Sequence, residues 1–188
     1  MRPSAERPYH HGNLRRVLLD TAIELLGEVG PSQLSLRELA RRTGVSNAAP
    51  VHHFGDKAGL FTEIAAEGFD MLATQLDEVR RHTDDFTEMG VAYVRFAVTH
   101  RAHFEVMFRP DLYHADDPDV VAANRAAAAH LYGPANATTG RSGKDAGIAA
   151  WSLVHGFATL WIGGNLDVSP DADPEALARR LGRMITLG

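Results

Sequence analysis

Apolar residues recur at the spacing of one helix face along almost the whole of this 188-residue chain. The first such run extends from Leu14 to Val29 and is stopped by Gly30-Pro31, and no segment shows a convincing period-2 strand pattern. We therefore predict an all-α fold with about nine helices. The helices after the first are expected at residues 36–43, 46–54, 56–81, 85–99, 101–108, 118–132, 144–165 and 174–187.

Helix-start and helix-stop signals frame three short helices at the front of the chain. Residues 35–38, SLRE, form a capping-box pattern, and Gly44 is placed to take a positive φ in the turn that follows. Ser46 is the expected N-cap of the third helix, Pro50 falls in its first turn, and Asp56 can cap a long fourth helix. Such a helix-turn-helix can place its third helix in the major groove of DNA, although three small helices of an ordinary bundle would show the same pattern.

Positive charge is concentrated in the front part of the chain. Residues 1–60 carry eight Arg or Lys and six Asp or Glu, a net +2, whereas the remainder carries 11 basic and 18 acidic residues, a net −7 that brings the chain to −5. This polarised distribution directs one end of a molecule toward phosphates and keeps the other end away from them.

Several function classes find no support in the residues. The absence of cysteine excludes disulfides, thiolate metal sites and cysteine nucleophiles. His100, His103, His114 and His155 lack the spacing of a zinc site, so neither a metal nor another cofactor is expected. Ser152 lies one turn from His155 without a nucleophile elbow, and we do not expect an enzyme.

An uncharged run at residues 146–166 passes a crude length test for a membrane span. Its Ala and Gly content, its polar residues and the lack of a basic cluster at either end favour a buried helix instead, so no membrane contact is expected. The start of the chain lacks the apolar stretch of a signal peptide, which predicts a cytoplasmic protein. Residues 133–143 are rich in turn formers and are expected to form a mobile loop, in which the glycosylation sequon at Asn136 is attributed to chance.

Motifs distributed over residues 9–69 resemble the DNA-binding domain of the TetR family of transcriptional regulators. They are LSLRELA at 34–40, TGVS at 43–46, AAP at 48–50, HF at 53–54 and DKAGL at 56–60. The leader YHHGNLR at 9–15 and the sequence WSLVHG at 151–156 resemble a subgroup with a C-terminal Trp-x-x-x-His-Gly motif. The resemblance implies a helix-turn-helix domain at 9–55 and a helical dimerisation and ligand-binding domain at 56–188.

The same resemblance, together with side-chain chemistry, nominates a DNA-binding surface. Lys57 is expected to meet a phosphate at a helix N-terminus, Asn47 can bond an adenine edge, and Ala48 or Ala49 can touch a thymine methyl. A solvated lysine, a helix-end hydrogen bond from asparagine and close packing of the alanines are the respective alternatives. The full expected set is Ser35, Arg37, Ser46, Asn47, Ala48, Ala49, Val51, His52, His53 and Lys57.

Val51 departs from the family pattern, which usually has a backbone-contacting tyrosine at this position. Either His52 or Arg37 takes over the positioning of the helix, or binding is weaker and more sensitive to salt. The departure at Val51 also makes it conceivable that the N-terminal domain no longer binds DNA.

The C-terminal domain is expected to contain a ligand pocket and a dimer interface. For both sets the alternative is an internal core. The expected ligand-binding residues are Phe86, Tyr93, Phe96, Phe104, Met107, Phe108, Trp151 and His155, in a cavity that opens near residues 133–143. The resemblance implies that the last two helices pair with their symmetry mates, and the nominated face consists of Trp151, Val154, Ala158, Trp161 and Ile162.

Two functional hypotheses follow. The leading one is a homodimeric repressor that binds a palindromic double-stranded operator and responds to an unknown small-molecule effector. The alternative is a helical small-molecule-binding protein or enzyme whose N-terminal domain no longer binds DNA. Sequence-specific binding to the DNA upstream of its own gene would distinguish the two.

Overall fold

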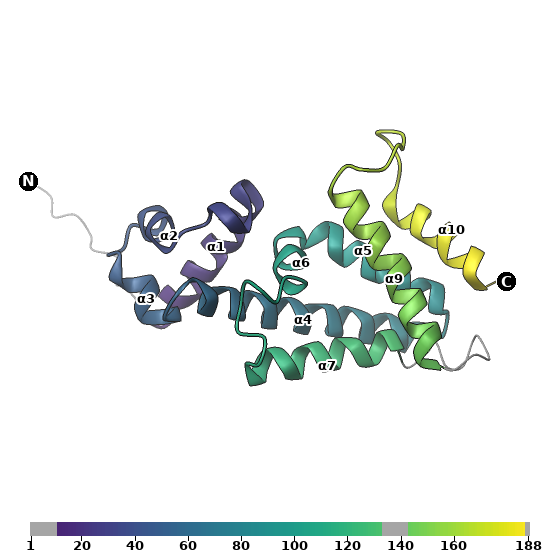
Figure 1. The fold of residues 1–188 in the computed structure, drawn as a ribbon, viewed down its shortest axis with the longest axis horizontal. Helices are drawn as coiled ribbons and strands as arrows, with labels where there is room; N and C mark the ends of the chain where they lie inside the picture. Colours follow the sequence, from purple (N-terminus) through teal and green to yellow (C-terminus); the bar gives the residue numbers. More distant parts are fainter. Residues whose placement is uncertain (1–10, 133–142, 187–188) are drawn as a thin grey trace, which may run out of the picture.

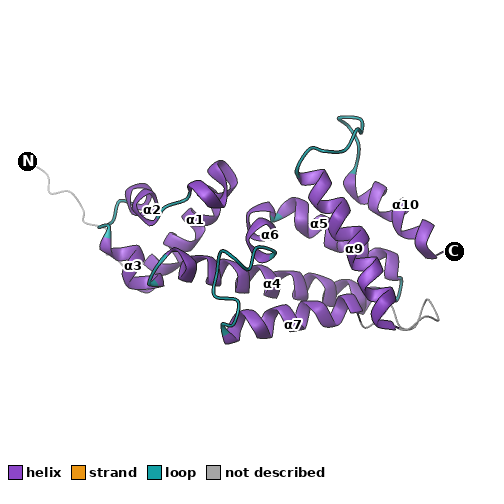
Figure 2. Ribbon diagram, in the orientation of Figure 1, coloured by secondary structure: helices purple, strands orange, loops and turns teal. Residues whose placement is uncertain are grey.

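The computed structural model of the chain describes residues 11–132 and 143–186, and these residues form nine helices and no strand (Figures 1 and 2). The all-α prediction is therefore confirmed. The helices are α1 (His11–Gln33), α2 (Leu36–Thr43), α3 (Ala48–Phe54), α4 (Lys57–His82), α5 (Phe86–Thr99), α6 (Arg101–Met107), α7 (Pro118–Tyr132), α9 (Gly143–Ile162) and α10 (Pro174–Thr186).

Helices α1, α2 and α3 gather at one end of the molecule, which we call the N-terminal cluster (Figure 1). The apolar stripe of α1 is buried, with Leu18 and Leu25 almost completely removed from solvent. Leu39 of α2 and Phe54 of α3 belong to the same core, which continues into α4 at Leu60. Burial of such a stripe supplies most of the stability of short helices, which are marginal in isolation.

The predicted boundaries of the N-terminal cluster follow from local chemistry. Gly30 adopts φ 74° and interrupts the helical geometry of α1 where the sequence predicts a stop. Ser35 caps α2, because its Oγ accepts a hydrogen bond of 3.2 Å from the Glu38 amide, and Gly44 ends α2 with φ 69°. Asp56 caps α4 by accepting from the Gly59 amide at 2.8 Å.

The start of α3 and the end of α9 differ from the prediction by more than one residue. The N-cap of α3 is Asn47 and not Ser46, whose carbonyl instead accepts from the Ala49 amide in a turn ahead of the helix. Because Asn47 already has helical φ and ψ, its side chain makes no capping bond among the described residues. Helix α9 ends at Ile162, three residues earlier than expected, and Gly164 follows with φ 66°.

Helix α4 extends from the N-terminal cluster into a larger helical bundle and lies beside α7 over much of its length (Figure 1). Helices α5, α9 and α10 pack against one another at the far end of the bundle. Ion pairs from Arg179 to Glu88 at 2.6 Å and from Arg95 to Glu175 at 2.6 Å join α10 to α5. The short helix α6 contacts both α1 and α4, so it lies between the N-terminal cluster and the bundle.

The predicted loop at 133–143, with the sequon at Asn136, falls outside the described residues except for its last position, and so does the start of the leader motif at 9–10. Within the part of the chain that is described, no helix is both long and apolar enough to cross a membrane.

Candidate functional site

The surface groove between α2 and α3 brings three of the predicted DNA-binding residues together. Ser35, Arg37 and Asn47 line this groove, which has a volume of about 400 Å³. Ser35 reaches it as the cap of α2, Arg37 as the second residue of that helix, and Asn47 as the cap of α3. All three are exposed to solvent. The groove is therefore an accessible, polar surface at the end of the molecule formed by the N-terminal cluster.

Intramolecular ion pairs neutralise most of the positive charge of α2. Arg41 donates two hydrogen bonds of 2.6 and 2.8 Å to Glu38, and these bonds lower the pKa of that carboxyl. Arg42 pairs with Glu28 of α1. Arg37 has no ion pair with any described residue, so it is the cation of α2 that remains available to an external anion. The pairing of Glu38 with Arg41 was not anticipated, although their i, i+3 spacing signals it.

Helix α3 exposes a short polar and small-residue face. Asn47 and Ala48 are exposed and Ala49 is half-buried, whereas Pro50 is buried against the core. The side-chain amide of Asn47 makes no capping hydrogen bond with a described residue. The structure therefore does not support the alternative role for this residue, a hydrogen bond at the helix end. Val51 is 50% exposed, so its side chain lies on the surface of α3.

His52 and His53 lie side by side at the end of α3. His52 is exposed and His53 is half-buried, with ring centroids 5.4 Å apart and planes inclined at 66°. The His53 ring also lies 6.3 Å from the ring of Phe54, which is a core residue as the sequence predicts. His52 is consequently the more accessible of the two imidazoles.

Lys57, the first residue of α4, lies partly against its own chain. Its Nζ is 3.4 Å from the carbonyl oxygen of Ser32 and 5.4 Å from the centroid of the Phe61 ring. Partial burial lowers the pKa of this ammonium group. A simple solvated lysine, the alternative considered for this residue, does not describe this environment, and a phosphate contact requires the side chain to turn outward.

In the bundle, five of the predicted ligand-binding residues form one aromatic cluster. The Tyr93 hydroxyl lies 2.8 Å from Nδ1 of His155, and the indole of Trp151 donates to the same hydroxyl at 3.3 Å. Phe108 packs on the His155 ring at a centroid distance of 4.6 Å and Phe104 packs on Phe108 at 5.0 Å. Burial lowers the pKa of His155, which favours its neutral form.

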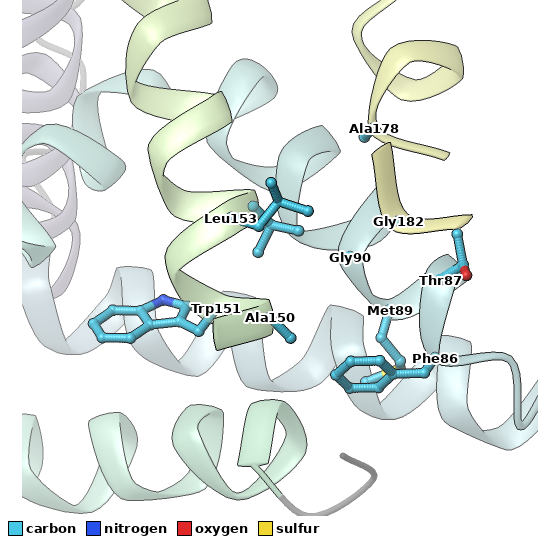
Figure 3. A pocket seen from close by; sticks show the side chains of 10 residues that line it. Phe86, Thr87, Met89, Gly90, Ala150, Trp151, Leu153, Ala178 and Gly182 are labelled. Atoms are coloured by element: carbon cyan, nitrogen blue, oxygen red, sulfur yellow. The ribbon is translucent and has the colours of Figure 1, made fainter. Parts of the chain in front are cut away.

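The remaining predicted ligand-binding residues lie elsewhere. Phe96 is fully buried and its ring packs against that of His100 at a centroid distance of 5.0 Å, so it is a core residue and does not line either cavity described below. Phe86 lines an apolar cavity between α5, α9 and α10 (Figure 3), whose volume of about 40 Å³ is close to that of a single water molecule. This cavity is too small for an effector.

A larger cleft of about 540 Å³ lies between α4, α7 and the segment that follows α6. Met107, Phe108 and Trp151 of the predicted set line it. Sequence reasoning missed Arg125 at this cleft, although an arginine within the alanine-rich run AANRAAAAH is a signal that could have been followed.

The dimer face nominated from the sequence is partly turned inward. Ala158 is fully buried within its own chain and cannot contact a partner, which corrects that prediction. Trp151 belongs to the aromatic cluster, and Val154 lies 3.0 Å from the position that a Cβ on Gly90 would occupy. An apolar helix buried on several sides gives no periodic signal that identifies its inward face, and this explains the error.

The outward surface of α9 consists of other residues. Ile148 and Leu160 are 43% and 45% exposed, and Ser152 between them is also exposed. Gly156 leaves open space on the same face, since a Cβ there would meet no described atom within 4 Å outside its own helix turn. Trp161 and Ile162 are half-buried, with the Trp161 ring 5.9 Å from that of Phe157.

A polar network joins the N-terminal cluster to the bundle and was not predicted. Arg16 of α1 donates to Glu67 of α4 at 2.5 Å, and Nε2 of His103 on α6 lies 3.3 Å from the same carboxylate. His103 is only 5% exposed, and this burial lowers its pKa despite the neighbouring carboxylate. The network provides a polar link between three helices that meet where the two parts of the molecule join.

No group of three or more His, Asp or Glu side chains arranged to hold a metal ion is found in the described ranges. Ser152 points outward on α9 whereas the imidazole of His155 bonds Tyr93, so these two side chains do not form a nucleophile and base pair.

Comparison with known proteins assigns both parts of the chain to one family. Residues 18–64 match the family model of bacterial regulatory proteins of the tetR family, and residues 86–185 match that of the tetracyclin repressor-like C-terminal domain. The HTH-type transcriptional regulator AcrR of Shigella flexneri is 44% identical over 50 residues, which are 27% of this chain and 23% of that protein. The matched region thus spans about a quarter of this curated relative.

Solved structures match the chain over almost its whole length. A protein of unknown function from Rhodococcus sp. RHA1 is 32% identical with a TM-score of 0.81, covering 97% of this chain and 98% of that one. The TetR family regulator PfmR from Thermus thermophilus has the same fold, with a TM-score of 0.69, 21% identity, and coverage of 92% and 98% of the two chains. With family models matching both its N-terminal helices and more than half of its length, the chain belongs to the TetR family of transcriptional regulators.

Proposed function

We propose that the chain is a cytoplasmic, homodimeric repressor that binds a palindromic DNA operator through residues 9–55 and responds to a small effector held by residues 56–188. It acts by binding rather than by catalysis. The observation that carries this proposal is the groove between α2 and α3. There the guanidinium of Arg37 and the side-chain amide of Asn47 face solvent together, the first without an ion pair and the second without a capping bond to any described residue. A cation for phosphate and an amide for a base edge are the two kinds of contact that specific DNA recognition needs.

The two side chains have different roles in this proposal. Arg37 contacts the phosphate backbone, and its contact is therefore independent of base sequence. Asn47 bonds a base edge from the start of the recognition helix α3. Lys57 adds a second phosphate contact once it leaves the Ser32 carbonyl, and His52 compensates in part for Val51.

The dimer in this proposal forms through the outward faces of α9 and α10. Exposed Ile148 and Leu160 supply apolar area on α9, and Met184, which is 73% exposed, supplies it on α10. Ser152 and Gly156 between them allow a second helix to approach closely. A two-fold axis through this surface pairs two N-terminal clusters for two operator half-sites. The sequence WSLVHG at 151–156 supports placement in the subgroup with that motif.

The proposal is tested by fluorescence anisotropy with labelled DNA from upstream of the gene and excess nonspecific competitor. The protein is expected to remain bound to the labelled DNA in the presence of the competitor. Asn47→Ala should cost about 1–3 kcal/mol on the operator alone, whereas Arg37→Ala should weaken binding to all DNA and flatten the salt dependence by about one unit. Arg80→Ala, which removes an exposed arginine on α4 far from the groove, is the matched control.

Absence of specific retention would refute the proposal and favour the alternative of a helical small-molecule-binding protein or enzyme that no longer binds DNA. Equal behaviour of the Arg37, Asn47 and Arg80 variants on every DNA would show that another surface makes the contact.

A further inference from the structure

The cleft between α4 and α7 is large enough for an organic ligand and is mostly apolar. Its volume of about 540 Å³ lies within the range of pockets that enclose small molecules. Phe69 and Leu72 of α4 line one side and Val120 and Ala127 of α7 line the other. Water in such a space gains few hydrogen bonds, so an apolar ligand body would displace it favourably.

Aromatic rings form the inner wall of the cleft. The rings of Phe69 and Phe108 meet edge to face at 5.8 Å, and Phe108 lies 6.1 Å from Trp151. The indole N–H is directed to the Tyr93 hydroxyl, so the Trp151 ring is held in place while it lines the cleft. Fixed aromatic faces and edges at these separations accept a further flat ring in offset or perpendicular packing.

The polar lining has one sign of charge. Arg125 is the cation of this cleft, and none of the described residues that line it is acidic. The side chains of Arg125 and Asn124 have no hydrogen-bond or ion-pair partner among the described residues, whereas the Tyr113 hydroxyl already donates to the Met107 carbonyl at 2.8 Å. The available polar groups are therefore a guanidinium and an amide next to each other on α7.

From this combination we infer that the effector is an apolar monoanion: a flat aromatic or unsaturated body seated against Phe69, Phe108 and Trp151, with one carboxylate or equivalent anionic group paired with Arg125. Asn124 donates a further hydrogen bond to the same group. A guanidinium matches a planar carboxylate through two parallel hydrogen bonds. The regulatory role of this ligand rests on the proposed function, but its binding does not.

The test compares two fluorescent probes that share one body and differ in charge. These are 1-anilinonaphthalene-8-sulfonate, an anion, and N-phenyl-1-naphthylamine, its neutral counterpart. Each is titrated into the full-length protein. Arg125→Gln should weaken binding of the anion about tenfold, as expected for loss of a charge-assisted contact, and should leave the neutral probe within about twofold. Arg80→Gln should change neither.

Two variants that introduce a bulky side chain, one inside the cleft and one outside it, test whether the probes bind in the cleft. Val121 lines the cleft and Val168 does not, and both are 40% exposed, so tryptophan can be introduced at either without opening the core. Val121→Trp should abolish binding of both probes, and Val168→Trp should leave both unchanged. Circular dichroism of each variant verifies that the helices are retained.

Equal losses of the two probes in Arg125→Gln would overturn the inference, because the arginine would then not select charge. Full binding of both probes to Val121→Trp would also overturn it, since the probes would occupy another surface. The titrations contain no DNA. A failure of operator binding would therefore refute the proposed repressor without altering these outcomes.

Discussion

A substitution of Gly156 tests the proposed dimer face, because it should raise the stability of the single chain and weaken the dimer. It lies within the 20-residue helix α9, and a Cβ at this position would meet no described atom within 4 Å beyond its own helix turn. A larger side chain should therefore be accepted by the single chain. It should not be accepted by a partner helix that packs closely over the same position.

The expected magnitudes follow from this geometry. Within one chain, Gly156→Leu replaces a poor helix former by a good one and should stabilise the chain by about 0.5–1 kcal/mol. In the dimer, each added side chain overpacks a close helix contact at a cost of about 1–3 kcal/mol. Because a two-fold interface contains the residue from both copies, the total is about 2–6 kcal/mol, which weakens the dimer by about thirtyfold to twenty-thousandfold.

Sedimentation velocity over a range of protein concentrations gives the dimer dissociation constant, and urea unfolding at the same concentrations gives the stability. Gly27→Leu is the matched control, because Gly27 is exposed on α1 and a Cβ there also meets no described atom within 4 Å. It should stabilise the chain similarly without affecting dimerisation. A Gly156→Leu protein that dimerises as tightly as the parent would refute the assignment of this face.

Three further variants address the cap, the recognition helix and a buried histidine. Ser35→Ala should lower the unfolding free energy by about 1 kcal/mol in thermal denaturation, whereas Ser46→Ala, at the position wrongly predicted to be a cap, should have little effect; equal effects would contradict the assigned caps. Val51→Tyr places a larger side chain on an exposed position and should tighten binding to operator and nonspecific DNA alike in anisotropy, unless His52 already makes the contact. Because burial lowers the pKa of His103, the unfolded chain binds a proton that the folded chain refuses, so the urea midpoint should fall as the pH drops from about 7.5 to about 5.5, through the ordinary histidine pKa of about 6.5. His103→Gln should show a smaller fall, and an unchanged pH dependence would mean that other groups are responsible.

Local signals predicted the helices well because each boundary is decided by residues within one turn. The stop at Gly30, the cap at Ser35 and the cap at Asp56 are all visible in a short stretch of sequence, and the structure has each of them. The error at Ser46 has the same origin. Ser46 and Asn47 are both good capping residues, and the choice between them depends on how the turn after Gly44 docks on the core.

The site depends on long-range packing and was less predictable. Spacing grouped Trp151 and Ala158 of α9 as one outward face, but an apolar helix that is buried on several sides contains no contrast from which its inward face can be read. The bond between Tyr93 and His155 joins residues 62 positions apart. The network from Arg16 through Glu67 to His103 likewise has no local pattern that predicts it.

Because α4 is long, a small tilt of the helix at the proposed effector cleft would produce a large displacement at its other end, in the N-terminal cluster. Its 26 residues span about 39 Å, and the cleft residue Leu72 lies about 22 Å along the axis from Lys57 at the start of the helix. A tilt of α4 by about 5° around Leu72 would displace its first turn by about 2 Å. In a two-fold dimer both copies move, so the spacing between the recognition helices can change by about 4 Å, a substantial mismatch against half-sites about 34 Å apart. A small angular change at the middle of one helix is therefore sufficient to take both recognition helices out of register with their grooves.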